Sequence, residues 1–153
     1  MIADKAQHPQ QNNVLLTSRL NNHFYSVDIG PVHVVMLSSE YYYYTEYGWD
    51  QIERQYRWIE QDLKRASLNR AQRPWIIAMA HRSFYCLIIS DNSCINDTRP
   101  DIRQGIHLHG NASNPRQFGL EEIFYRYGVD IFGNVFSLTI DQVSQLTLFK
   151  HFC

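Results

Sequence analysis

The chain has 153 residues, a length typical of one folded domain; 44% of them are hydrophobic and 19% are charged. This composition excludes a disordered or collagen-like protein. Fourteen basic and fifteen acidic residues give a formal net charge of -1, which removes the usual electrostatic basis for binding nucleic acid or anionic lipid. No apolar run approaches the ~20 residues of a membrane-spanning helix.

Two β-rich runs flank Gly30-Pro31 in the first half of the chain, and the second run, residues 32–37, is almost entirely apolar. We expect an antiparallel hairpin whose second strand is buried within a sheet, although Pro31 could also simply open the second strand. Four consecutive tyrosines at positions 41–44 follow. We interpret them as aromatic packing at the edge of a loop.

Residues 49–65 show the clearest helical pattern in the chain. Apolar side chains recur at intervals of four, three and four residues, at Ile52, Tyr56, Ile59 and Leu63. This spacing predicts an amphipathic helix with one buried face. Asp50, followed three residues later by Glu53, is typical of a capping box at the start of that helix.

The second half of the chain alternates between strand and helix patterns. Pro74 opens the apolar run WIIAMA, which predicts a second buried strand at residues 75–80. Residues 83–118 are irregular, and such long loops are usually functional. Residues 120–127 carry a helical apolar stripe with Gly128 as its C-cap, and another strand is expected from Val129 onward. This order favours an α/β fold with functional groups on loops at strand ends.

His81 is the first candidate for chemistry because it directly follows the predicted strand, where open α/β sheets place their ligands. We expect its imidazole to face a cleft; from position alone, a structural, hydrogen-bonded histidine is the alternative. Arg82 could face phosphate or form an ion pair with a loop carboxylate. His107 and His109 would project to one side of an extended segment and could bind metal, but we favour a solvated loop there.

The residues around His81 resemble a known family. Residues 74–86, PWIIAMAHRSFYC, are similar to the strand-His-Arg-Pro-Met-Tyr-Cys segment of animal purple acid phosphatases, in the calcineurin-like metallophosphoesterase superfamily. Residues 25–33, YSVDIGPVH, resemble the family's hairpin, and residues 55–63 and 119–130 resemble two further segments. The resemblance covers about residues 24–130. It leaves a non-matching polar N-terminus, residues 1–23, and a tail unlike the family, residues 131–153.

The resemblance implies an incomplete portion of the family's αββα sandwich, a mixed sheet with covering helices. The family hydrolyses phosphate monoesters at a dinuclear centre of ferric iron beside zinc, manganese or a second iron. His81 matches the family's single histidine ligand to the divalent metal. The upstream ligand motifs are not present in this sequence. The downstream Gly-His-x-His falls on Phe136 and Leu138 without gaps, or on residues 133–136 with a two-residue deletion, and neither alignment supplies a histidine.

We therefore assign no catalytic residue, and we interpret the chain as a fragment of a phosphatase-like metallohydrolase that is inactive alone. Tyr25, Asp28 and Glu40 are interpreted as structural. The alternatives are a non-catalytic truncated isoform or pseudoenzyme acting as a binding module, and a gene-model artefact. Missing strands would leave apolar surface uncovered, so we expect a partner or self-association through an exposed sheet edge.

Several features favour a secreted or lysosomal protein. Cys86 and Cys94 are close enough in sequence to bridge and resemble a spaced pair in the family, while Cys153 is left over. Asn96 and Asn111 begin N-glycosylation sequons. The polar amino terminus, however, contains no apolar stretch typical of a secretory signal peptide. We therefore expect a chain that belongs to a longer protein or whose start was misplaced.

Overall fold

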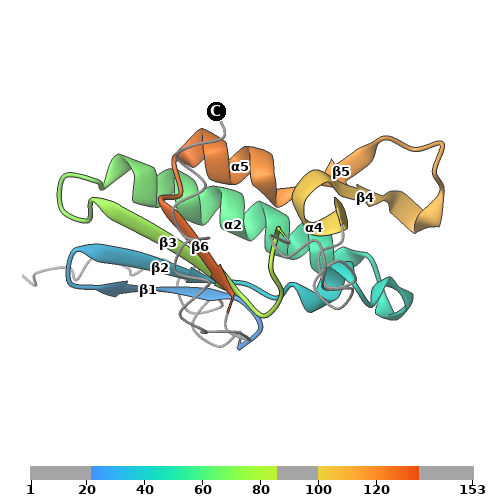
Figure 1. Ribbon diagram of the computed structural model, residues 1–153, viewed down its shortest axis with the longest axis horizontal. Coiled ribbons are helices and arrows are strands. Elements are labelled where there is room, and N and C mark those ends of the chain that lie inside the picture. The colour runs from blue at the N-terminus through green and yellow to red at the C-terminus, as the bar shows by residue number, and fades with distance from the viewer. Residues whose placement is uncertain (1–21, 86–99, 135–153) are drawn as a thin grey trace, which may run out of the picture.

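The computed structural model describes residues 22–85 and 100–134 (Figure 1). Its larger sheet contains β1 (Tyr25–Ile29), β2 (Val32–Met36), β3 (Trp75–Ala80) and β6 (Ile131–Asn134), in the order β1-β2-β3-β6. β1 pairs with β2 in the antiparallel sense, whereas β2 with β3 and β3 with β6 are parallel. The predicted α/β fold with a mixed sheet is therefore confirmed.

The predicted hairpin is also confirmed. β1 and β2 are joined by Gly30-Pro31, and Gly30 adopts a φ of 54°, a conformation that favours glycine because it has no Cβ. β2 lies between β1 and β3, as expected for an apolar central strand. β3 has the predicted limits, Trp75–Ala80.

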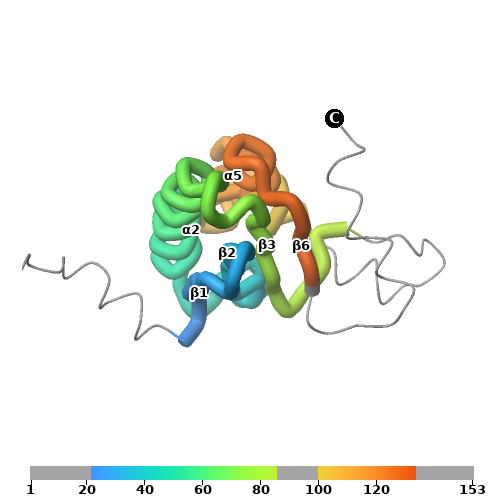
Figure 2. Tube along the Cα trace, turned by 90° about the vertical axis from the view of Figure 1, so that its left-hand side faces the viewer, coloured from blue at the N-terminus to red at the C-terminus, as the bar shows by residue number. Residues whose placement is uncertain are grey.

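Two amphipathic helices, α2 (Asp50–Leu68) and α5 (Leu120–Tyr127), lie on the same side of the larger sheet (Figure 2). Their predicted apolar stripes face the core, where Ile52, Ile59 and Leu63 of α2 meet Leu120, Ile123 and Phe124 of α5. Gly128 caps α5 in the left-handed conformation, with a φ of 69°. None of the helices in the described part of the chain is long and apolar enough to cross a membrane.

The predicted capping box of α2 is wrong. Trp49 occupies the N-cap position, and no side chain caps the first turn. Glu53 instead accepts a hydrogen bond of 2.7 Å from Arg57 Nε, one turn further along the helix. An i,i+4 partner of opposite charge competes for the carboxylate that a capping box requires.

The description of residues 83–118 as irregular needs correction for residues 100–118. This part contains α4 (Pro100–Gln104), β4 (Gly105–His107), the 3-10 turn η3 (Leu108–Gly110) and β5 (Arg116–Phe118). β4 and β5 form a small antiparallel sheet. Elements of three to five residues are too short to produce a readable hydrophobic period.

Backbone contacts close this small sheet against the start of α5. A Cβ on Gly119 would lie 2.5 Å from the carbonyl oxygen of Arg103, and one on Gly105 would lie 2.2 Å from the carbonyl oxygen of Gln117. Gly105 also has a φ of 93°. Only glycine fits at both positions. The glycines that interrupt the hydrophobic pattern of this segment therefore allow its backbone segments to pass this close to one another.

Candidate functional site

β3 presents His81 at the edge of the larger sheet. Its alternate side chains Ile76, Ala78 and Ala80 are buried beneath the helices, and His81 follows directly with an exposed side chain. Because β2, β3 and β6 run parallel, their carboxyl ends meet at this same edge. The prediction that His81 stands at the carboxyl end of a buried strand is therefore confirmed.

The backbone on both sides of His81 is fixed by the core. Ala80 is 1% exposed before it, and Phe84 is 1% exposed after it. The Phe84 ring stacks on Phe124, with centroids 5.5 Å apart and an interplanar angle of 13°, and also contacts Phe132. The chain thus leaves the core only for the short turn that carries His81.

Arg82 forms an ion pair with Glu40, in the loop after β2. Its Nε and one terminal nitrogen donate to the two carboxylate oxygens at 2.8 and 3.1 Å. The guanidinium carbon lies 4.2 Å from the centre of the Tyr43 ring, within cation–π distance. Of the two interpretations of Arg82, the structure shows the ion pair with a loop carboxylate.

Two buried polar residues, Ser39 and Gln55, hold the loop after β2 in place. Ser39 Oγ accepts a 3.0 Å hydrogen bond from the backbone N–H of Arg82. Gln55, in α2, accepts from the N–H of Ser38 at 2.7 Å and donates to its carbonyl oxygen at 2.9 Å. Sequence analysis missed both positioning residues. The available signal was Gln55, a polar side chain within the apolar stripe of α2, three residues after Ile52.

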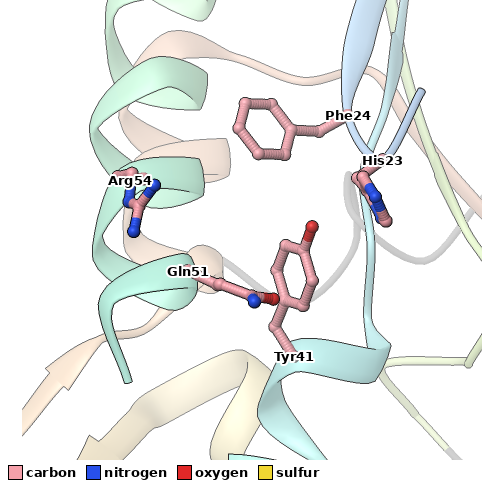
Figure 3. Close-up of a pocket in the computed structure, with 5 residues that line it drawn as sticks. All are labelled: His23, Phe24, Tyr41, Gln51 and Arg54. Atoms are coloured by element: carbon pink, nitrogen blue, oxygen red, sulfur yellow. The ribbon is translucent and has the colours of Figure 1, made fainter. Parts of the chain in front are cut away.

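A pocket of about 240 Å³ lies beside this loop, and Figure 3 shows its side chains. It is lined by His23, Phe24, Tyr41, Gln51 and Arg54. Burial raises the pKa of Tyr41, although the positive charge of Arg54 opposes this. His81 does not line this pocket, so a cleft at His81 remains a prediction.

The tyrosines at positions 41–44 pack as expected for a loop edge. Tyr41 and Tyr42 belong to the 3-10 turn η1 (Glu40–Tyr42), and a second turn, η2 (Thr45–Tyr47), follows. Tyr42 is 1% exposed, and its hydroxyl donates to the carbonyl oxygen of Phe118 at 2.7 Å. Burial therefore raises the pKa of Tyr42.

His107 and His109 do not form the alternative considered for them, a metal-binding pair on one side of an extended segment. The backbone turns at His109, which has a φ of 56°. His107 Nδ1 lies 2.6 Å from the carbonyl oxygen of Asn114, whereas the His109 ring packs against Trp49. The two rings therefore have separate structural contacts.

The remaining predicted sites lie in the loops. Asn111 is exposed, and its side-chain oxygen accepts a 3.0 Å hydrogen bond from the N–H of Ser113. Cys86, Cys94 and Asn96 lie outside the described residues. Their roles in a disulfide and in glycosylation remain predictions.

A second histidine, which sequence analysis did not single out, lies near the amino ends of the parallel strands, at the opposite end from His81. His33 Nε2 lies 2.9 Å from Asp62 Oδ2, and its Nδ1 lies 2.7 Å from Asp28 Oδ1. Both ring nitrogens thus face carboxylate oxygens, an arrangement that favours the doubly protonated, positively charged imidazole. Arg73 completes the group with a 3.1 Å ion pair to Asp28, which is structural, as predicted.

The pKa values of this network are shifted in opposite directions. Burial lowers the pKa of His33, but the bonds to Asp62 and Asp28 outweigh it, and the net pKa is raised. Burial raises the pKa of Asp62, but hydrogen bonds from His33, Ser26 and Arg65 leave it below its usual value. Each shift favours the charged form, as in a structural ion pair.

The described residues do not fit a dinuclear metal centre. A catalytic zinc needs about three protein ligands, and a bridged pair of metals needs more. Within residues 22–85 and 100–134, no group of three or more histidine, cysteine, aspartate or glutamate side chains could hold a metal ion. His81 is thus a ligand-type residue without the rest of a ligand set in this part of the chain.

Comparison with known proteins identifies relatives of the chain, although no protein-family model matches it. It is 44% identical over 108 residues to acid phosphatase type 7 of Mus musculus, covering 71% of this chain and 23% of that protein. The Danio rerio protein of the same name is 44% identical over 111 residues, 71% of this chain and 24% of the relative. Purple acid phosphatase 18 of Arabidopsis thaliana is 29% identical over 111 residues, covering 72% and 20%. The chain thus spans between a fifth and a quarter of the length of these relatives, and over the matched segment it is similar to acid phosphatase type 7 and, at lower identity, to a purple acid phosphatase.

Proposed function

We propose that this chain forms part of a phosphate-monoester hydrolase of the purple acid phosphatase type, in which His81 is a ligand of the divalent metal. The observation that carries the proposal is the place of His81. It is exposed at the carboxyl end of β3, between the buried residues Ala80 and Phe84, with Arg82 fixed by Glu40. A metal ligand needs such a backbone because the metal tolerates little movement of its donor atoms.

The second part of the proposal is that these 153 residues do not hydrolyse phosphate esters alone. β6 runs beside β3, and its backbone pairs Asn134 with Ala80, next to His81. Within residues 22–85 and 100–134, His81 belongs to no group of three or more side chains that could hold a metal ion. The remaining ligands, and the iron with zinc, manganese or a second iron, are proposed to depend on polypeptide outside this chain.

The first test compares the chain with His81→Ala and His109→Ala, using p-nitrophenyl phosphate at acid pH. His109 is the matched control because it is also an exposed histidine but lies outside the β3 edge. All three proteins should show the same background rate, since removing one ligand from a site that does not assemble changes nothing. A loss of rate confined to His81→Ala would reveal a working site and contradict the proposed inactivity.

A chimera tests the ligand role of His81 directly. Residues 24–130 of this chain would replace the matching segment of the Mus musculus relative, which supplies the rest of the polypeptide. In that chimera, His81→Ala should lower both the bound divalent metal and the hydrolysis rate, the latter by roughly 100-fold, while His109→Ala should change neither. An active chimera that keeps its metal and rate after His81→Ala would exclude His81 as a ligand.

We also propose that the protein is secreted or lysosomal, with glycosylation at Asn96 and Asn111 and a disulfide between Cys86 and Cys94. The support from the structure is limited to Asn111, whose sequon lies on an exposed turn after η3. An acceptor asparagine must lie at the surface to be modified.

Non-catalytic binding is the second candidate function. It is favoured by an apolar face of the larger sheet that no described element covers. Such a face in a soluble chain is typical of an interaction surface.

A further inference from the structure

The pocket beside the loop after β2, here called the Arg54 pocket, combines aromatic walls with polar side-chain ends (Figure 3). His23 and Phe24 come from the segment that leads into β1, Tyr41 comes from η1, and Gln51 and Arg54 come from the start of α2. Its volume of about 240 Å³ lies below the ~300–1,000 Å³ typical of pockets for drug-sized ligands. The pocket therefore suits a ligand of about one ring.

Three rings form the walls of the Arg54 pocket. Phe24 packs against Trp58 of α2, with ring centroids 5.1 Å apart, so the helix supports it from behind. The rings of His23 and Tyr41 have centroids 6.0 Å apart and are tilted by 33°. Figure 3 shows the hydroxyl of Tyr41 pointing between Phe24 and His23. A flat ligand would find aromatic contacts on more than one side.

Arg54 brings a positive charge that no carboxylate neutralises within residues 22–85 and 100–134. Every other arginine in this part of the chain forms an ion pair with an aspartate or glutamate. Glu53, next to Arg54 in α2, is bound by Arg57 at 2.6 Å. A guanidinium presents paired N–H donors that match a carboxylate, so an uncompensated one at a pocket favours an anionic ligand.

Two further polar groups of the pocket are available to a ligand. The hydroxyl of Tyr41 and the amide of Gln51 form no hydrogen bond with another described residue. The charge of Arg54 opposes the rise in pKa that burial gives Tyr41, which is consistent with a guanidinium near this hydroxyl. Because the net pKa is raised, Tyr41 stays protonated at neutral pH and can donate to an anion, as can Gln51 and Arg54.

We propose that the Arg54 pocket binds a small aromatic carboxylate, with its ring among His23, Phe24 and Tyr41 and its charge at Arg54. A single arginine matches the one negative charge of a carboxylate better than the nearly two charges of a phosphate monoester. His81 does not line this pocket, so the proposal is independent of the metal-ligand role proposed for His81. One ring and one exposed ion pair predict a dissociation constant on the order of 1 mM.

Protein NMR with benzoate tests the proposal at neutral pH. In amide proton–nitrogen spectra of the full chain, benzoate up to about 20 mM should cause saturable shifts at residues 23–24, 41 and 51–54. Arg54→Met keeps an apolar stem without the charge and should weaken binding about fivefold or more. Arg57→Met is the matched control, because Arg57 is an exposed arginine of α2 that does not line the pocket. It should bind benzoate like the unmodified chain.

Three analogues separate the charge of the ligand from its ring. Benzamide keeps the ring but carries no charge, and acetate keeps the carboxylate but has no ring. Each should bind at least about fivefold more weakly than benzoate. Phenyl phosphate should bind no more tightly than benzoate. Benzamide or acetate binding as well as benzoate, or phenyl phosphate binding more tightly, would overturn the proposed class of ligand.

Three results with benzoate itself would overturn the proposal. They are the absence of saturable shifts, unchanged affinity in Arg54→Met, and shifts centred on His81 that disappear in His81→Ala. The last would place the anion at the end of β3 instead of in the Arg54 pocket. Circular dichroism establishes that each variant is folded, and if Arg54→Met is not, Gln51→Leu takes its place because Gln51 is an exposed residue of the same pocket. The metal-ligand role of His81 is tested separately, by the chimera.

Discussion

The two ends of the parallel strands use charged residues in different ways. At the amino end, His33 is held by Asp28 and Asp62, and Arg70 is held by Asp130, so these charges are closed into networks inside the fold. At the carboxyl end, Arg82 and Glu40 pair with each other and leave His81 exposed beside them. The comparison indicates that the charged residues at the amino end stabilise the fold, whereas those at the carboxyl end pair with each other and leave one side chain, His81, at the surface.

The amino end owes its order to Arg70 in particular. Arg70 donates to Asp130 at 2.9 Å, to the carbonyl oxygen of Pro74 at 2.6 Å and to that of Gly128. Asp130 also accepts from the N–H of Ile76 at 2.9 Å. One arginine thereby joins the end of α2, the start of β3 and the end of α5.

The largest effect is therefore expected from Arg70→Met, which keeps much of the side-chain length but leaves Asp130 and two carbonyl oxygens without this donor. The free energy of unfolding should fall by about 3 kcal/mol, measured by urea denaturation. Arg57→Met is the control, because Arg57 forms an exposed ion pair with Glu53 within α2, and it should cost only about 0.3 kcal/mol. Equal losses in the two variants would show that the Arg70 network does not hold the amino end together.

His33→Gln should give the next largest effect, about 2 kcal/mol near pH 5, because it removes the cation between Asp28 and Asp62. The pKa of His33 is raised on folding, so its contribution to stability is complete below ~6.5 and is lost as the pH rises through the folded value. The pKa of Asp62 is lowered, so its contribution is present above ~4 and is lost as the pH falls through the folded value.

These signs predict that the network contributes most between about pH 4 and 6.5. Urea denaturation at pH 5 and pH 8.5 should show a smaller difference between the chain and His33→Gln at the higher pH. Arg65 and Arg73, which pair with Asp62 and Asp28, are present in both proteins, so the comparison isolates the contribution of His33. His109→Gln, at an exposed position, is the control, and a difference from the unmodified chain that does not change with pH would contradict the assignment to His33.

The smallest effects are expected at the carboxyl end. Glu40→Gln preserves the shape of the side chain but removes the charge that pairs with Arg82, and it should cost about 1 kcal/mol because both partners are partly exposed. His81→Ala should change stability by less than ~0.5 kcal/mol, as expected for an exposed residue. A loss of about 2 kcal/mol in His81→Ala would mean that His81 is a structural residue, contrary to its proposed role as a ligand.

Sequence patterns predicted the elements that are long or uniform. The apolar run after Pro74 gave the limits of β3, and the spacing of Ile52, Ile59 and Leu63 identified the buried face of α2. Both signals are local, since they depend only on where apolar side chains occur within one element. The position of His81 followed from the first of them.

The sequence could not reveal contacts that depend on packing. Asp62 reaches His33 only because α2 lies across β2, and the two residues are 29 positions apart. The choice between phosphate and carboxylate as the neighbour of Arg82 likewise depended on where the loop with Glu40 folds back, 42 positions earlier in the chain. Such pairs become visible only when the arrangement of the elements is known.

The topology of the larger sheet also sets an expected order of assembly. β1 and β2 are separated by two residues and can close quickly, whereas β6 pairs with β3 across a long connection, with Ile76 and Asp130 lying 54 positions apart. Closing a long loop costs entropy before its contacts form, so distant pairings tend to appear late in folding. We therefore expect the pairing of β6 with β3, next to His81, to form last. Errors in synthesis or folding should then affect this part of the sheet first.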